Sequence, residues 1–122
     1  MSRENDLLGR TQRFALAAIK FCESLPKDET SRILARQLLR SATSVGANYR
    51  SAHRARSTAD FISKMGVVVE EADESAYWIE LITATQETDK DKSAPLHREA
   101  DELVAIAVSS INTARKKLTN SA

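Results

Sequence analysis

The 122-residue chain contains few residues that interrupt regular structure, with only three glycines and two prolines. Sandwich and barrel folds need many turns, where glycine and proline are common, so this scarcity argues against both. Aromatic residues make up 5% of the chain, and a core must therefore be built mainly from leucine, isoleucine, valine and alanine. Long helices with small residues at their contacts pack closely around such a core.

The chain has one cysteine, Cys22, and no long apolar run. One thiol makes neither an internal disulfide nor a metal site. Because Cys22 lies among apolar residues, we expect a buried and unreactive thiol. No apolar run reaches the ~18 residues of a membrane span, and the first residues lack a signal-peptide pattern. We therefore expect a cytoplasmic protein that does not bind membranes.

Motifs for catalysis and for metal binding are also missing from the sequence. It contains no nucleophile elbow, Walker loop or glycine-rich phosphate motif. Di-iron bundles use Glu-x-x-His on two helices, but the residues three before His53 and His97 are Arg50 and Ala94. We expect no enzymatic activity, no cofactor and no metal site.

Apolar residues recur at three- and four-residue steps in four segments, which predicts four amphipathic helices. We place them at about residues 5–24, 29–55, 58–85 and 94–117. Pro26 ends the first helix, Ser57 caps the third, and Pro95 lies in the first turn of the fourth. Because short connections favour antiparallel neighbours, the predicted fold class is all-α, an antiparallel up-down-up-down four-helix bundle that forms a single domain over residues 1–122.

All four predicted helices carry an apolar stripe that should face the core. The stripe of the first helix is Leu7, Thr11, Phe14, Ala18, Phe21 and Leu25. The stripe of the second is Leu34, Leu38, Ala42, Val45, Tyr49 and Ala52. The main stripe of the third is Phe61, Met65, Val68, Ala72, Ile79 and Ile82. The stripe of the fourth is Leu96, Ala100, Leu103, Val104, Ala107, Ile111, Ala114 and Leu118.

Charge is segregated along the chain, although the net charge is only +1. The segment from Thr30 to Ala59 has six arginines and no acid, whereas the segment from Asp60 to Asp91 has nine acids and two lysines. The arginines, here called the arginine face, are candidate nucleic-acid ligands: Arg32, Arg36, Arg40, Arg50, Arg54 and Arg56. The first five lie within about 80° on the side of their helix opposite the apolar stripe. They span about 33 Å, close to one turn of a duplex.

Three explanations of the arginine face remain open from the sequence. It could be a solvated helix surface, or guanidinium groups could bind the phosphates of a polyanion. The third explanation is pairing with the acids of the third helix, in the same chain or in a neighbouring subunit. Those acids are Glu70, Asp73, Glu74 and Glu80.

The segment from Thr43 to Gly46 has low helix propensity and could be the turn of a helix-turn-helix. Against this, the apolar stripe and the arginine face keep their phase across Gly46, which a turn would break. One continuous helix is therefore favoured, in which Gly46 permits the close approach of another helix.

The dipeptide Tyr77-Trp78 has two interpretations. Trp78 lies about 100° from the main apolar stripe of its helix, beside Val67 and Leu81. It is then either an edge residue of the core or an exposed anchor of an interface. A second apolar face on a small bundle favours self-association. The predicted oligomer interface is Val67, Glu70, Glu74, Trp78 and Leu81.

Three runs resemble a bacterial family of four-helix-bundle proteins. They are Arg40-Ser-Ala-Thr-Ser-Val-Gly-Ala-Asn48-Tyr-Arg-Ser-Ala-His, Ser57-Thr-Ala-Asp-Phe61-Ile-Ser-Lys-Met and Glu70-Glu-Ala-Asp-Glu74-Ser-Ala-Tyr-Trp78-Ile-Glu-Leu. The family is named for proteins encoded in intervening sequences of large-subunit ribosomal RNA genes. The likeness covers all four predicted helices and is densest between Gln37 and Leu81.

The resemblance implies a closed antiparallel bundle, assembly into a homopentamer and a basic surface that binds RNA or DNA. A relative with this fold is the accessory protein of diversity-generating retroelements, which partners a reverse transcriptase and RNA. This chain has Ser51 where many members have glutamate. If that glutamate pairs with an arginine, its absence leaves Arg50 or Arg54 freer for an outside anion. The sequence thus predicts a non-enzymatic, homo-oligomeric adaptor that binds nucleic acid without sequence preference, or alternatively a protein-interaction module.

Overall fold

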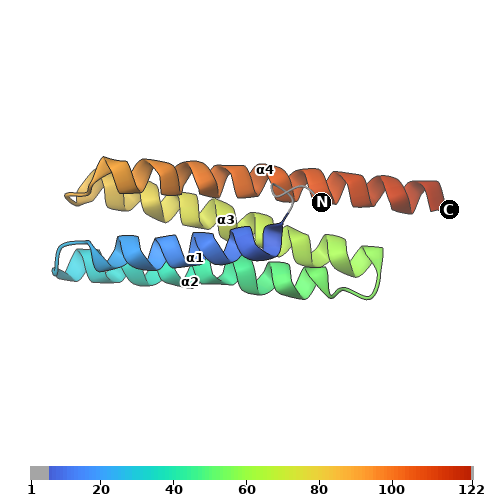
Figure 1. Ribbon diagram of the computed structural model, residues 1–122, viewed down its shortest axis with the longest axis horizontal. Coiled ribbons are helices and arrows are strands. Elements are labelled where there is room, and N and C mark those ends of the chain that lie inside the picture. Colours follow the sequence, from blue (N-terminus) through green and yellow to red (C-terminus); the bar gives the residue numbers. More distant parts are fainter. Residues whose placement is uncertain (1–5, 122) are drawn as a thin grey trace.

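A computed structural model describes residues 6–121, which form four helices. They are α1 (Leu7–Glu23), α2 (Glu29–His53), α3 (Thr58–Thr85) and α4 (Lys90–Ser121). The connections α1–α2 and α3–α4 lie at one end of the molecule, and the connection α2–α3 lies at the other (Figure 1). Successive helices are therefore antiparallel, which confirms the predicted all-α four-helix bundle.

Each helix packs against its neighbours in chain order, and α4 closes the bundle against α1. The packing of α1 on α4 is the least extensive of the four seams, and a groove lies between these two helices. The last turns of α4 extend beyond the α2–α3 connection (Figure 1). The short α1 leaves the α2–α3 end of the bundle less covered than the opposite end.

Polar caps define the starts of the helices. The side chains of Asp6, Asp28 and Ser57 each accept a hydrogen bond from the backbone N–H three residues later. Such caps satisfy backbone donors that the first turn leaves unpaired. The prediction for Ser57 is confirmed.

The predicted start of the last helix, at residue 94 in front of Pro95, was wrong. The helix α4 begins at Lys90, because the Asp89 side chain accepts from the backbone N–H of Asp91 and its carbonyl accepts from Lys92 and Ser93. Pro95 is therefore the sixth residue of α4, beyond the first turn, where a missing N–H leaves one carbonyl of that turn without a helical donor. The helix also extends past the expected end at residue 117, to Ser121.

The predicted apolar stripes form most of the core. All six residues of the first stripe are buried, including Leu25, which follows the end of α1. In the second stripe, Leu38, Ala42, Val45 and Ala52 are buried. Leu34 and Tyr49 are half-buried at its edge. Leu118 was wrongly assigned to the core and is 44% exposed, because it lies on the turns of α4 that extend beyond the bundle.

The helix α2 is continuous through Gly46, which excludes the helix-turn-helix alternative. A methyl group at Gly46 would lie 3.4 Å from the Thr11 hydroxyl and 3.6 Å from the Thr11 carbonyl carbon. Gly46 therefore lies where α1 approaches α2 closely, as expected, and the space there is about one methyl group deep.

Candidate nucleic-acid interface

The middle arginine of the arginine face is already paired within the chain. The Arg40 guanidinium contacts the carboxylates of Glu74 and Glu71 on α3, the latter at 3.5 Å. The Trp78 indole N–H donates to Glu74 Oε1 at 3.2 Å and holds that carboxylate in place. Burial raises the pKa of the Glu71 carboxyl, and the positive charge of Arg40 opposes this shift. The ion pairs of Arg40 therefore link α2 to α3.

Two serines lie beneath this ion pair, in the core of the α2–α3 seam. Ser41 and Ser75 are both 0% exposed, and their hydroxyl oxygens are 2.9 Å apart. A hydroxyl–hydroxyl bond between facing helices favours one relative rotation and height, because it forms only when the two serines lie opposite each other.

The other five arginines are exposed, and none forms an ion pair with any residue between 6 and 121: Arg32, Arg36, Arg50, Arg54 and Arg56. Like charges four residues apart on a helix repel each other by a few tenths of a kcal/mol per pair. An external anion would relieve this repulsion. The structure thus divides the predicted ligands into one structural arginine and five available ones.

A groove of about 590 Å³ runs along the α1–α2 seam beside two of the available arginines. Its α2 wall includes Arg50, His53 and Arg54, and its α1 wall includes Leu8 and Gln12. The close contact at Gly46 forms its floor. Guanidinium groups at the rim of such a groove can reach phosphate oxygens.

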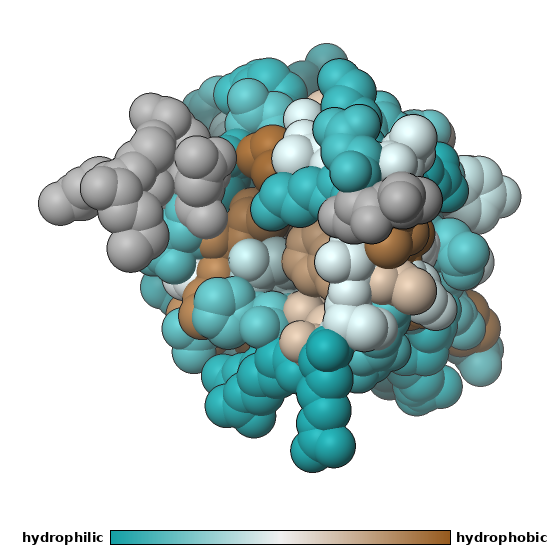
Figure 2. Space-filling view, turned by 90° about the vertical axis from the view of Figure 1, so that its right-hand side faces the viewer, coloured by the Kyte–Doolittle hydropathy of each residue, from teal (hydrophilic) through white to brown (hydrophobic). Residues whose placement is uncertain are grey.

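A second groove, of about 720 Å³, lies at the α2–α3 end that α1 does not cover. It is lined by the end of α2, the start of α3 and the second half of α4, and it contains His53, Arg56 and Lys117 together with five hydroxyl side chains. Hydrophobic side chains are visible between hydrophilic ones at this end (Figure 2). His53 lines both grooves, so the basic surface continues from the side of the bundle to its end.

The model of one family, described as 23S rRNA-intervening sequence protein, matches residues 3–109. The chain belongs to this family. A crystal structure of a protein of unknown function from the S23 ribosomal protein family of Bacteroides thetaiotaomicron is 30% identical, with a TM-score of 0.79. The similarity covers 86% of this chain and 97% of that one. No curated protein matches the chain.

The residues that first suggested the 23S rRNA-intervening sequence family meet in the α2–α3 seam. Arg40 and Ser41 come from the first of the three similar runs, and they contact Glu74 and Ser75 from the third. Trp78, also in the third run, completes the contact through Glu74. These family-like residues therefore join α2 to α3, and the available arginines lie outside this cluster.

The predicted oligomer-interface residues are only partly on the surface of α3. Val67 and Glu70 are exposed, whereas Trp78 and Leu81 are half-buried. Glu74 is engaged by Arg40 of the same chain. Tyr77, which was not in the predicted set, is 52% exposed and forms an edge contact with Trp78. Their role in assembly stays a prediction.

Sequence reasoning missed two groups of polar contacts that involve α4. Arg10 on α1 binds Glu99 at 2.6 Å and Glu102 at 2.7 Å, and the hydrogen bond to Glu99 raises the pKa of Arg10. His97 lies 2.8 Å from Glu80 on α3. Both groups join residues far apart in the chain, so no local spacing could have revealed them.

Three other features considered from the sequence are the cysteine, a metal site and a membrane span. Cys22 is half-buried, and burial is the main cause that raises its pKa to about 11. In the described part of the chain, no three histidine, cysteine or acidic side chains are grouped as a metal site would require. None of the helices within residues 6–121 is long and apolar enough to span a bilayer.

Proposed function

We propose that this protein is a non-enzymatic, homo-oligomeric adaptor whose arginine face binds the phosphate backbone of RNA or DNA without sequence preference. One observation carries the proposal: Arg32, Arg36, Arg50, Arg54 and Arg56 are exposed on α2 and its end, with no anionic partner among residues 6–121. The family name, which refers to ribosomal RNA, favours RNA as the first ligand to examine.

The arrangement supports backbone contact over base readout. The available arginines extend over about 33 Å, and a nucleic-acid duplex presents a phosphate charge about every 1.7 Å of its axis. An α-helix that reads bases inserts into the major groove, but α2 is packed along its length against α1 and α3. Its outer face can lie along a backbone and cannot enter a groove deeply.

The experiment is fluorescence anisotropy of a short labelled single-stranded RNA between about 50 and 200 mM salt. Five arginine–phosphate contacts give a slope of log K against log salt of about −3.5 on a single strand, because each contributes about −0.7. The affinity should then fall about a hundredfold over this range. Absence of binding at the lowest salt would refute the proposal.

Paired variants locate the binding surface. Arg50→Gln with Arg54→Gln should reduce the slope by about 1.4, since two contacts are lost. The matched control, Arg115→Gln with Lys116→Gln on the last turns of α4, removes the same charge from another exposed surface and should leave most of the slope. Equal losses in both would show that binding depends on net charge and not on the arginine face.

A protein-interaction module is the second candidate, and the Arg40 pair favours it. Arg40 already pairs with two carboxylates of α3, and an acidic partner protein would supply carboxylates to the other arginines in place of phosphates. Failure to bind RNA and DNA at low salt, with the arginines still exposed, would support this candidate.

A further inference from the structure

Two surfaces of opposite charge lie on different sides of the bundle. The first, here called the acidic edge, is the outer face of α3 at Glu70, Asp73, Tyr77 and Glu80, all exposed. Glu80 contacts His97, while Glu70 and Asp73 have no ion-pair partner among the described residues. Tyr77 places an aromatic ring among these acids with half of its surface in water. Exposed tyrosines of this kind are enriched in protein interfaces.

The second surface, here called the basic groove, is the open seam between α1 and α4. It has a volume of about 540 Å³ and an apolar floor of Phe14, Ala17, Phe21, Pro95 and Leu96. Its rim carries Arg13, Lys20 and Lys92, which form no ion pair with any residue in 6–121. Arg10 and Glu99, at the same groove, neutralise each other. The groove therefore combines apolar surface with an excess of positive charge.

The two surfaces match in charge and in spacing. Arg13 and Lys20 are seven residues apart on α1, and Asp73 and Glu80 are seven residues apart on α3. Both separations are about 10.5 Å along a helix, with the two residues on nearly the same side. Ala17 lies between the cations and Tyr77 lies between the acids, so a large ring faces a small side chain when the charges are aligned. A third helix laid into a groove between two helices is a common mode of recognition.

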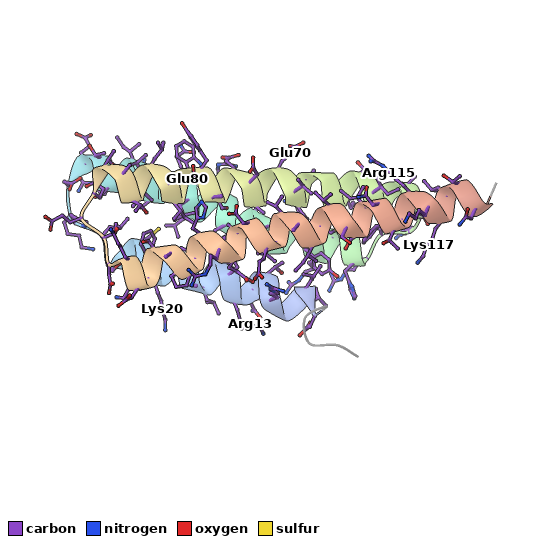
Figure 3. The ribbon with its side chains drawn as sticks, turned by 90° about the horizontal axis from the view of Figure 1, so that it is seen from above. Arg13, Lys20, Glu70, Glu80, Arg115 and Lys117 are labelled. Carbon is purple, nitrogen blue, oxygen red and sulfur yellow. The ribbon has the colours of Figure 1, made fainter. Side chains whose placement is uncertain are left out.

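We propose that the acidic edge of one copy of this chain docks into the basic groove of the next copy. Arg13 and Lys20 lie along the edge of the molecule opposite Glu70 and Glu80 (Figure 3), so one copy cannot make this contact with itself. A contact between two different surfaces is heterologous, and repetition of it closes a ring or extends a filament. This inference rests on the homo-oligomer of the proposed function and names the two surfaces that form it.

The test uses charge-reversed full-length chains and light scattering after size-exclusion chromatography. The wild type should have a mass that is a multiple of 13.5 kDa. The groove variant, Arg13→Glu with Lys20→Glu, and the edge variant, Asp73→Lys with Glu80→Lys, should each elute as a 13.5 kDa monomer. The control, Arg115→Glu with Lys116→Glu, should keep the wild-type mass. Unchanged far-UV circular dichroism and melting temperature will show that the variants fold.

Restoration by complementary charges is the decisive measurement. An equimolar mixture of the groove and edge variants should reassemble, because each has the surface that the other lacks, and the chain with all four substitutions should regain the wild-type mass. A monomeric wild type, a variant that stays oligomeric, or failure of both restorations would overturn the inference. RNA anisotropy of the monomeric variants separates the two proposals, since the arginine face is intact in them and should still show a salt-dependent affinity.

Discussion

The hydroxyl pair Ser41–Ser75 allows a quantitative test of how the α2–α3 seam is held. Each hydroxyl has one proton to donate. Besides each other, Ser75 has the Glu71 carbonyl oxygen at 2.9 Å and Ser41 has the Leu38 carbonyl oxygen at 3.2 Å. If one serine is replaced, the other therefore still donates to its own helix and no buried donor is left unpaired.

This geometry predicts non-additive losses of stability. A hydrogen bond between neutral groups contributes about 1 kcal/mol net, whereas a stranded buried group costs more. We expect Ser41→Ala and Ser75→Ala each to lower the free energy of unfolding by about 1 kcal/mol. The double variant should also lose about 1 kcal/mol, because the first substitution has already removed the shared bond. The coupling energy of the cycle is then about 1 kcal/mol.

Urea unfolding followed by circular dichroism, at one fixed protein concentration, measures these energies. Fixed concentration is needed because assembly would stabilise the folded chain by mass action. The slope of free energy against urea should not change, since no large surface is exposed. The control is Ser63→Ala, which replaces an exposed serine on α3, the helix of Ser75, and should change the free energy of unfolding by less than about 0.5 kcal/mol. A double variant that loses twice as much as either single variant would refute the shared bond.

Three further predictions concern Gly46, Cys22 and Arg40. Gly46→Ala should stabilise the protein by about 0.5–1 kcal/mol in the same urea assay, because the added methyl group makes an ordinary contact with Thr11 and alanine favours a helix. Destabilisation would show that α1 and α2 are too close for the methyl group. Cys22, with a pKa of about 11, should react with a disulfide reagent at pH 8 about a hundredfold more slowly than the exposed control Ser24→Cys, and equal rates would contradict its burial. Arg40→Gln should lower the free energy of unfolding by about 0.5 kcal/mol at pH 7, a value limited by solvent screening, and by less at pH 5. The sign follows because burial raises the folded-state pKa of Glu71, and the positive charge of Arg40 opposes this shift. Without Arg40 the Glu71 carboxyl of the folded chain holds its proton more tightly, so the variant loses stability as the pH rises through that raised pKa. A loss of stability that grows toward pH 5 would contradict this argument.

The local structure of this protein was predictable because it depends on neighbours in the chain. Apolar spacing gave four helices, and α3 has the predicted bounds of residues 58–85. The start of α4 was misplaced because Pro95 is a strong signal for a first turn, while the cap at Asp89 has a weaker sequence pattern. The exposed arginines were predictable for the same reason, since a charged side chain opposite an apolar stripe faces water.

The amino-acid sequence by itself determined which face of each helix meets the core and where charge of each sign collects, because helical periodicity converts spacing into direction. Only the tertiary structure decided which of these side chains contact one another. The pairs of Arg40 with Glu71 and Glu74, Arg10 with Glu99, and His97 with Glu80 join different helices, and each depends on the relative rotation and height of two elements. Those parameters are set by the packing of the whole core, so the division of the arginine face into one structural and five available residues emerges only when the four helices are assembled.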